Sequence, residues 1–178
     1  MNLTTSTLDT PVGPFRVALR GDALCAAVFS DHWAEAEARL VARFGPLTWD
    51  EKEPAARARF AAYFAGDLGA LDDLAFDLGG TPFQARVWDA LRHIPTGSTT
   101  TYAEVAQRLG LAPGASRAVG SANGANPVWV AIPCHRVIAK SGALAGYAGG
   151  IHRKQWLLDH ESSRRKTAAL GRETPRSK

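Results

Sequence analysis

The segment Pro133-Cys134-His135-Arg136-Val137-Ile138 places a potential nucleophile directly before a potential base. Cys134 is one of only two cysteines in the chain, and a cysteine reacts as its thiolate, so its surroundings set its reactivity. Because unpaired cysteines are also among the most buried residues, composition alone favours a core role for Cys134. The neighbouring histidine and the apolar segment that holds both residues instead favour a nucleophilic cysteine.

Extended runs and a glycine-rich loop flank this cysteine. Residues 128–132 form an apolar run between two prolines, and a second extended stretch is expected at 136–139. Four glycines between residues 142 and 150 allow the backbone to approach a flat ligand closely. A closing helix is expected from residue 151 to about residue 160, so that it ends at Glu161.

Residues 79–123 predict helices with clear start signals. Thr81 with Gln84, and Thr101 with Glu104, each form a capping-box pattern, and Pro82 suits a first helical position. After a Gly/Pro link at 111–114, another helix is expected at 115–123. Two helices joined by a tight turn predict a helix-turn-helix.

The second helix of this pair consists almost entirely of small residues and one long cation, Arg117. Small residues are typical of a helix packed closely against a neighbour. They are equally typical of a helix that approaches a nucleic-acid groove, with Arg117 projecting into it. The basic balance of the second half favours the groove.

Residues 1–75 predict a separate small domain without chemistry of its own. Short alternating apolar runs up to residue 29 indicate hairpin strands, and helices are expected at 31–44 and 54–65. The sequence therefore predicts an α+β protein in three parts. A small N-terminal antiparallel-sheet-plus-helix scaffold (1–75) precedes a mainly helical C-terminal domain with a helix-turn-helix (79–161) and a basic, disordered tail (162–178).

The composition excludes several other classes of protein. At 46% hydrophobic and 21% charged residues, the chain has the composition of an ordinary globular protein. No apolar stretch approaches the roughly 18 residues that span a bilayer, and the first residues, which lack a basic stretch followed by an apolar run, predict no secretory signal. Two cysteines cannot form a disulfide framework, which fits a reducing cytoplasm. With scattered histidines and no Cys-x-x-Cys motif, no metal is expected.

Charge is distributed unevenly along the chain. Residues 1–75 hold 7 Lys/Arg and 11 Asp/Glu, residues 76–161 hold 8 and 5, and residues 162–178 hold 6 and 1. An acidic first part and a basic remainder indicate a polyanion that meets the second half only. The last segment fits both a solvated tail and an arm that attracts phosphates.

With these residues in place, the second half resembles the O6-alkylguanine-DNA alkyltransferases, in particular the stand-alone bacterial methylated-DNA–protein-cysteine methyltransferases. The resemblance covers residues 79–161 in unbroken order, whereas residues 1–75 match only in size and in strand–helix character. The segments that carry it are Gly80-Thr81-x-Phe83-Gln84, Arg117-Ala118-Val119-Gly120, Asn126-Pro127, Pro133 through Ile138, Gly146-Tyr147-x-Gly149-Gly150 and Lys154 through Glu161.

The resemblance implies DNA repair by direct reversal of damage. Such a protein binds double-stranded DNA through the minor groove, rotates the alkylated guanine out of the stack and moves the alkyl group irreversibly to Cys134. O4-alkylthymine is a further candidate substrate. The resemblance also implies a cytoplasmic monomer that uses no cofactor, has no membrane partner and acts once per molecule.

The resemblance assigns roles to individual residues of this chain. Arg117 is expected to fill the gap left by the flipped base, and the helix around it to be the recognition helix. Tyr102 is expected near the flipped nucleotide as a proton donor, and Asn126 to brace the joint between recognition helix and active-site strand. The other expected DNA contacts are Ala115, Ser116, Ala118 and Ser121. The other expected substrate contacts are the Val137 carbonyl, the backbone near Tyr147 and Ala148, Trp129 and Lys154.

Physical chemistry independently supports a thiol relay. Displacement at an alkyl carbon needs a strong nucleophile, and thiolate is the best that a side chain offers. Adjacent side chains rarely face each other, so we expect His135 to reach the Cys134 sulfur through a water molecule. Glu161 can orient and stabilise the imidazolium, as the third member of a triad does. We expect such a thiolate to titrate below about 8.5, and Tyr102 or Lys154 to protonate the leaving guanine.

Two positions need separate comment. Ala148 stands where many relatives have serine, so a side-chain hydrogen bond to the base oxygen is absent here. Trp129 is equally compatible with a wall of the alkyl pocket and with a core tryptophan.

Three other functions are compatible with parts of the sequence. A non-repairing sensor of alkylated DNA has the same fold, but proteins of that kind lack the cysteine that Cys134 retains. A cysteine hydrolase would need an oxyanion hole that nothing in the sequence marks. A plain helix-turn-helix regulator leaves the Pro133-to-Ile138 segment unexplained, and too few cysteines are present for a fused regulatory zinc domain.

Overall fold

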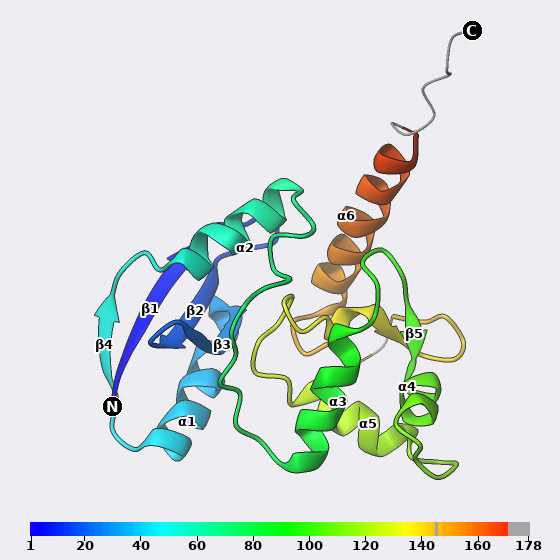
Figure 1. The fold of residues 1–178 in the computed structure, drawn as a ribbon, viewed down its shortest axis with the longest axis horizontal. Coiled ribbons are helices and arrows are strands. Elements are labelled where there is room, and N and C mark those ends of the chain that lie inside the picture. The colour runs from blue at the N-terminus through cyan, green and yellow to red at the C-terminus, as the bar shows by residue number, and fades with distance from the viewer. Residues whose placement is uncertain (145, 171–178) are drawn as a thin grey trace, which may run out of the picture.

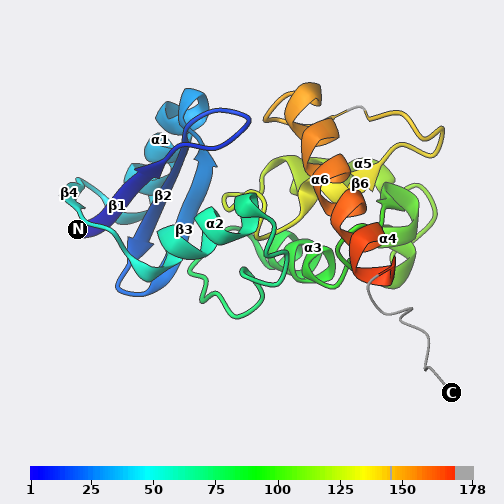
Figure 2. The ribbon, with the colours of Figure 1, turned by 90° about the horizontal axis from the view of Figure 1, so that it is seen from above.

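The structure is a computed structural model that describes residues 1–144 and 146–170, with side chains up to residue 162. Two lobes lie side by side (Figure 1). One is built on the N-terminal sheet and the other on the helices of the second half, and the view from above shows the same division (Figure 2). The α+β prediction is confirmed.

The N-terminal lobe is a sheet of four strands in the order β3-β2-β1-β4. Strands β1 (Asn2–Leu8), β2 (Phe15–Arg20) and β3 (Ala23–Phe29) are antiparallel, as predicted. Strand β4 (Thr48–Glu51) pairs parallel to β1 and was not predicted. Acidic residues are poor strand formers, so this strand depends on pairing with the β1 edge rather than on its own propensity.

Two helices pack against this sheet. The 3₁₀-helix η1 (Ser30–His32) leads into α1 (Trp33–Phe44), which packs on β3, and α2 (Ala55–Ala65) packs on β1. Three phenylalanines form the centre of the lobe, with the ring of Phe15 at 5.1 Å from both Phe29 and Phe60. Helix α2 thereby gains a fixed position next to the second lobe.

The C-terminal lobe consists of helices around a two-stranded parallel sheet. Both predicted capping boxes are present, so α3 begins at Pro82 and α4 at Tyr102. The elements, in chain order, are α3 (Pro82–Arg92), β5 (Thr100–Thr101), α4 (Tyr102–Arg108), α5 (Ser116–Gly124), η2 (Cys134–Arg136), β6 (Val137–Ile138) and α6 (Ile151–Leu170). Strands β5 and β6 pair with each other.

The outer edge of β3 joins the two lobes. Ala27 exchanges hydrogen bonds with the segment before Cys134: its N–H donates to the Pro127 carbonyl at 2.9 Å, and its carbonyl accepts from the Trp129 N–H at 2.7 Å. Leu24, on the same strand, is bonded in the same way to residues 75 and 77. The N-terminal sheet therefore continues into the strand that leads to Cys134.

Helix α6 is longer than predicted. It was expected to end at Glu161, but its backbone remains helical to Leu170. The first part of the expected tail, residues 162–170, is therefore helical, because a helix that is already nucleated and packed extends at little cost through polar residues. Residues 171–178 lie outside the described residues, and the division into three parts stays a prediction.

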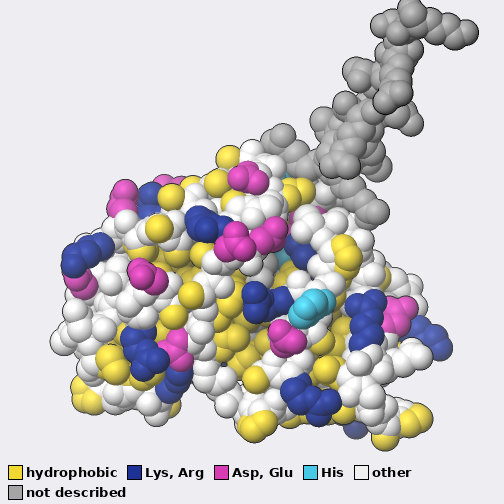
Figure 3. Space-filling view, in the orientation of Figure 1, with side chains coloured by type: hydrophobic (Ala, Val, Ile, Leu, Met, Phe, Trp, Pro, Cys, Tyr) yellow, Lys and Arg dark blue, Asp and Glu magenta, His cyan; other side chains and the backbone are white. Residues whose placement is uncertain are grey.

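The described residues include no helix with the length and apolar character that crossing a membrane requires. On the face drawn in Figure 3, basic and acidic side chains are interspersed, and hydrophobic side chains are visible between the two lobes. This face therefore carries no large field of one sign among the side chains drawn in colour.

Candidate active site

Cys134 lies directly after a tight turn and opens η2. Its N–H bonds to the Ile132 carbonyl at 2.8 Å across Pro133, whose φ of −80° and ψ of 62° are those of an inverse γ-turn. The Cys134 side chain is only 4% exposed. The turn before Cys134 and the 3₁₀-helix that begins at it thus fix the backbone that carries the buried thiol.

A second tight turn precedes this one. Val130 has a φ of 71°, and around it the Ala131 N–H bonds to the Trp129 carbonyl at 2.9 Å. A left-handed backbone is unusual for a β-branched residue and costs about 1–3 kcal/mol. Such strain persists only where the surrounding structure holds it, and Val130 is buried in the core.

Asn126 holds this strained segment together. Its Nδ2 donates to the Ile132 carbonyl at 2.8 Å, and its Oδ1 accepts the Val128 N–H at 3.0 Å. Its own carbonyl accepts the Trp129 indole N–H at 3.0 Å. Asn126 lies two residues after the end of α5 and is fully buried, so it lies at the joint between that helix and Cys134.

Glu161 and His135 form a buried pair behind the thiol. His135 Nε2 lies 2.9 Å from Glu161 Oε1, and both side chains are fully buried. The same oxygen accepts from Tyr63 Oη at 2.7 Å and from Arg136 Nη2 at 2.9 Å. Oε2 accepts from Arg136 Nε at 2.9 Å and from the Gly97 N–H at 3.1 Å. The predicted pairing of His135 with Glu161 is therefore present in the structure.

The electrostatics of this pair fix the state of the imidazole. Burial alone would raise the pKa of Glu161, but the charge and hydrogen bond of His135, with those of Arg136, hold that pKa well below its ordinary value. Burial lowers the pKa of His135, against the opposing attraction of Glu161. A neutral imidazole that donates from Nε2 to a carboxylate has a lone pair on Nδ1. Nδ1 is buried and has no hydrogen-bond partner among the described protein atoms, so it is a base ready to accept a proton.

The expected low pKa of the thiol was wrong. Burial raises the pKa of Cys134 to about 11, although a hydrogen bond from Asn126 and the charge of Lys154 oppose the rise. The sequence pointed to the basic neighbours, but removal from water outweighs them. Cys134 is therefore a neutral thiol at rest and needs a base at the moment of reaction.

The structure brings the two candidate proton donors to the same region. Tyr102 is half-buried, and burial and the nearby Cys134 raise its pKa. A Cβ on Gly146 would lie 3.2 Å from Tyr102 Oη, so the glycine-rich loop passes close to that hydroxyl. Lys154 is fully buried and donates to the Val137 carbonyl at 2.6 Å.

The glycine-rich loop and Trp129 form an aromatic wall. The rings of Trp129 and Tyr147 lie 5.8 Å apart, and Trp129 also contacts Phe29 of β3 at 6.1 Å. A Cβ on Gly149 would lie 2.7 Å from Tyr147, so only glycine fits there. The Tyr147 hydroxyl is buried without a described partner, whereas Ala148 is exposed and offers only its backbone.

Helices α4 and α5 present one face outward. Trp88 of α3 fixes α5 from behind, because its indole N–H bonds to the Ala122 carbonyl at 2.9 Å. The predicted DNA-contacting residues of α5 and its cap divide by exposure: Arg117, Ala118 and Ser121 are exposed, while Ala115 and Ser116 are half-buried. Val119 on the opposite face of α5 is fully buried. One face of the helix therefore packs against the protein, and the other is open to solvent.

Sequence reasoning missed the donors that hold Glu161. Tyr63 falls within the helix expected at 54–65 and was given no role there, and Arg136 was named only as part of the segment around Cys134. The signal for Tyr63 was general: a buried tyrosine hydroxyl needs a partner, but the sequence could not say which. Arg136 also donates to the Ile94 carbonyl at 2.6 Å and to Thr96 Oγ1 at 3.1 Å, so it ties η2 to the end of α3.

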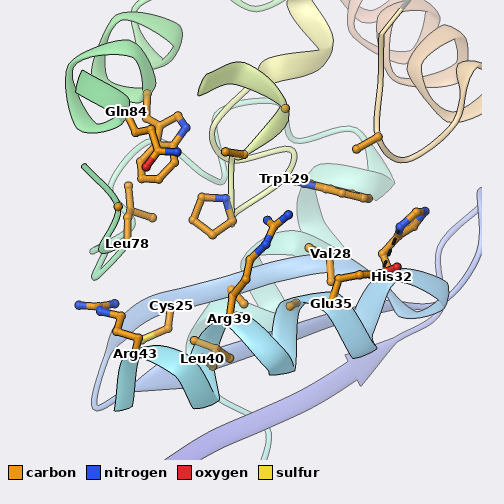
Figure 4. Close-up of a pocket in the computed structure, with 18 of the residues that line it drawn as sticks. Cys25, Val28, His32, Glu35, Arg39, Leu40, Arg43, Leu78, Gln84 and Trp129 are labelled. Atoms are coloured by element: carbon orange, nitrogen blue, oxygen red, sulfur yellow. Dashed lines mark ion pairs between the residues drawn. The ribbon is translucent and has the colours of Figure 1, made fainter. Parts of the chain in front are cut away.

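One pocket between the two lobes is bordered by Trp129 and Ala148 but does not contain the buried thiol. Its volume is about 600 Å³, and it lies between α1 and the second lobe, with Arg39 pointing into it and Trp129 on its far wall (Figure 4). Cys134, His135 and Glu161 do not line it. The reactive groups, not this hollow, therefore define the candidate site.

Among the described residues, no group of three or more His, Cys, Asp or Glu side chains could hold a metal ion.

Comparison with known proteins places this site in a family. Residues 82–163 match the family model described as "6-O-methylguanine DNA methyltransferase, DNA binding domain". A methylated-DNA–protein-cysteine methyltransferase of Mycobacterium tuberculosis is 44% identical over 166 residues, which is 89% of this chain and 92% of that protein. The chain belongs to the methylated-DNA–protein-cysteine methyltransferase family. The resemblance of residues 79–161 is thus confirmed.

Other members of the family agree with this assignment. The Salmonella typhimurium protein of the same name is 57% identical over 103 residues, which is 58% of this chain. That match spans only 60% of the Salmonella protein. The Mycobacterium tuberculosis enzyme solved in complex with DNA has a TM-score of 0.75 at 42% identity, and the match covers 92% of this chain and 94% of that one. The family and the fold therefore extend over both lobes.

Proposed function

We propose that this protein repairs DNA by moving the alkyl group of O6-alkylguanine irreversibly onto Cys134. The observation that carries the proposal is a buried thiol next to a histidine whose Nδ1 is unpaired and whose Nε2 is bonded to Glu161. Relatives named methylated-DNA–protein-cysteine methyltransferases support it. Each molecule would act once, since nothing in this arrangement removes an alkyl group from sulfur.

The proposed step uses the pair as a base. Because Cys134 has a pKa of about 11, its proton must leave as the sulfur attacks. His135 Nδ1 takes that proton, through a bridging water, and Glu161 stabilises the resulting imidazolium. The sulfur–carbon bond forms as the carbon–O6 bond breaks, and both electrons of the broken bond leave with the guanine. The guanine takes a proton from Tyr102, with Lys154 as the second candidate donor.

The outward face of α5 supports a role in DNA binding. We propose that α5 enters the minor groove with Ala118 and Ser121, and that Ala115 and Ser116 flank it. Base extrusion costs a few kcal/mol, and an inserted side chain can offset part of that cost. Arg117, the exposed cation of α5, is the proposed inserted side chain.

The aromatic wall and the glycine-rich loop are the proposed place of the flipped base. The backbone of Tyr147 and Ala148 and the Val137 carbonyl would hold its edge, and Asn126 would keep the thiol in line with it. Trp129 would border the space for the alkyl group. The space beside the aromatic wall and the glycine-rich loop would also take O4-alkylthymine. We propose that the protein works as a monomer in the cytoplasm, without a cofactor.

The experiment that tests the function is a stoichiometric transfer. The protein is incubated with duplex DNA carrying a labelled O6-methylguanine, and the label is located by peptide mass spectrometry. One methyl group on Cys134 per inactivated protein is expected. Repeated turnover would indicate hydrolase chemistry, and tight binding of the lesion without transfer would indicate a sensor; either result contradicts the proposal.

Arg117→Ala separates DNA handling from chemistry. We expect the variant to lose repair of duplex DNA while it retains most of its reaction with free O6-benzylguanine, which needs no extrusion. Single-turnover rates on both substrates measure this. Equal losses on the two substrates would mean that Arg117 is not the extrusion residue.

A further inference from the structure

Tyr63 brings the N-terminal lobe into direct contact with the buried pair. It lies on α2, its side chain is 1% exposed, and its hydroxyl donates to Glu161 at 2.7 Å. Its ring packs edge-on against Phe64 and against His160, with centroids 5.5 Å apart in each case. His160 Nε2 lies 2.8 Å from the Tyr63 carbonyl. Packing and backbone contacts thus fix the phenol independently of its hydrogen bond.

The hydroxyl of Tyr63 shares one oxygen with the base. Glu161 Oε1 receives Tyr63 at 2.7 Å and His135 Nε2 at 2.9 Å. Each donor on a carboxylate oxygen draws off part of its negative charge, so the two compete for the same acceptor. Burial first, and then the charge of Glu161, raise the pKa of Tyr63 well above its ordinary value. Tyr63 therefore remains a donor throughout the working pH range.

We propose that Tyr63 is a positioning residue of the relay: it fixes the Glu161 carboxylate and limits the negative charge that Oε1 presents to His135. This inference rests on the proposed function and deepens it, because it assigns the N-terminal lobe a part in setting the base. Residues 1–75 had been interpreted as a scaffold without chemistry. The contact from α2 makes that lobe a regulator of the proton acceptor.

The groups that face this network come from four parts of the fold. His135 and Arg136 come from η2, Glu161 and Lys154 from α6, Tyr63 from α2 and Tyr147 from the glycine-rich loop. The charges of Arg136 and Lys154 oppose protonation of His135, and that of Glu161 favours it. Arg136 also favours, and Tyr147 opposes, ionisation of Tyr63. Among these, Tyr63 is the neutral hydroxyl donor to Glu161, so it can be removed without changing the net charge of the network.

Removal of the Tyr63 hydroxyl should raise the pKa of His135. With one donor fewer, Oε1 holds more negative charge and stabilises the imidazolium more strongly, so the pKa of His135 rises. His135 accepts the thiol proton only when it is neutral, and transfer is lost as pH falls through its pKa. In Tyr63→Phe the loss should therefore begin at higher pH, by about 0.5 to 1 unit.

The experiment compares Tyr63→Phe with Phe64→Leu in the full chain. Phe64 is the next residue on α2, and its ring contacts Trp156 of α6 at 6.0 Å, so its variant loosens the same interface without removing a bond to Glu161. Single-turnover transfer from methylated duplex DNA is measured across pH. The ring signals of His135 are titrated by NMR in DNA-free protein. We expect both midpoints to rise in Tyr63→Phe and to stay at the wild-type value in Phe64→Leu.

A fluorinated tyrosine keeps the experiment decisive if Tyr63→Phe folds poorly. Site-specific 3-fluorotyrosine at position 63 retains the ring and makes the hydroxyl a stronger donor, so the His135 midpoint should fall rather than rise. Unchanged midpoints in both Tyr63 variants, or an equal rise in Phe64→Leu, would overturn the inference. A merely structural role would reduce the amount of folded protein without moving either midpoint.

Failure of this inference and failure of the proposed function give different results. If wild-type protein transfers no methyl group to Cys134, the proposed function is wrong, whatever Tyr63 does. The NMR titration needs neither DNA nor transfer, so it still reports whether Tyr63 sets the pKa of His135. If transfer occurs and the titration does not respond to Tyr63, only the inference about Tyr63 is wrong.

Discussion

The two cysteines of this protein are buried to the same degree but lie in different surroundings. Cys25, on β3, is 1% exposed and Cys134 is 4% exposed, and burial raises the pKa of both thiols. Next to Cys25 lies the carboxylate of Asp77, whose charge raises the pKa of the thiol further. Next to Cys134 are an amide donor, Asn126, and a cation, Lys154, which lower it.

The difference shows that burial alone does not distinguish the proposed nucleophile from the other cysteine. What distinguishes Cys134 is an adjacent histidine with an unpaired Nδ1, a carboxylate behind that histidine, and a backbone fixed by two tight turns. Cys25 Sγ lies 3.7 Å from the Ala23 carbonyl and 4.0 Å from the Asp77 carboxylate, both long for hydrogen bonds. A nucleophile is thus made by the groups that can take its proton.

Replacing each cysteine gives the largest expected contrast. Cys134→Ala should abolish alkyl transfer and leave binding of alkylated duplex DNA, because α5 is untouched. Cys25→Ala should transfer at the wild-type rate. Labelled-methyl transfer and a gel-shift titration measure the two properties. Transfer by Cys134→Ala, or its loss in Cys25→Ala, would remove the distinction between the two thiols.

The carboxylates next to the two thiols give the second contrast. Glu161→Gln should slow transfer by about 10²- to 10⁴-fold, because His135 loses the group that orients and stabilises it. It should also lower the free energy of unfolding by about 3–5 kcal/mol, because Arg136 is left buried without its partner. Asp77→Asn should leave transfer unchanged. It should cost at most about 1 kcal/mol, because Arg20, one of its two arginine partners, is 50% exposed.

Two measurements check this pair of variants. Single-turnover rates are compared with the free energy of unfolding from urea titration of the same preparations. Equal rates for Glu161→Gln and Asp77→Asn would contradict the relay. A large stability loss in Asp77→Asn would show instead that the surface arginines depend on that carboxylate more than their exposure indicates.

The raised pKa of Cys134 predicts a loss of stability at alkaline pH. A thiol with a folded pKa of about 11 contributes stability that is complete below its unfolded pKa and is lost as pH rises toward 11. The loss should reach about 2–3 kcal/mol. Cys134→Ala should lack this part of the alkaline decline, whereas Cys25→Ala should retain it. Urea titrations at pH 8 and pH 10.5 test this, and parallel curves for wild type and Cys134→Ala would contradict it.

The sequence predicted those features of the fold whose hydrogen bonds join residues close together in the chain. The capping boxes of Thr81 and Thr101 each close within three residues, and the structure begins α3 and α4 at the next residue. The pairing of His135 with Glu161 came from the chemistry of a relay and from the family resemblance. Local patterns and a known motif were therefore sufficient for both the helix starts and the centre of the site.

Contacts between distant segments could not be predicted in this way. The bond from Tyr63 to Glu161 joins residues 98 apart, and no periodicity in α2 marks its hydroxyl as different from a core ring. The pKa of Cys134 depends on how completely the fold excludes water from the thiol, and this is a property of the assembled structure. The sequence showed which groups are near Cys134, but not that burial outweighs them.

The smallest expected contrast concerns two glycines, one beside the aromatic wall of the Cys134 site and one at the end of α5. A Cβ on Gly149 would lie 2.7 Å from the Tyr147 ring and 3.0 Å from Trp129, so Gly149→Ala must displace the wall. We expect it to cost about 1–3 kcal/mol and to slow transfer.

A Cβ on Gly124, in the last turn of α5, meets no atom within 4 Å. Gly124→Ala should therefore add up to about 1 kcal/mol by restricting the unfolded chain. Thermal unfolding and transfer rates separate the two, and a Gly149→Ala variant with full activity would mean that the wall does not border the reacting group.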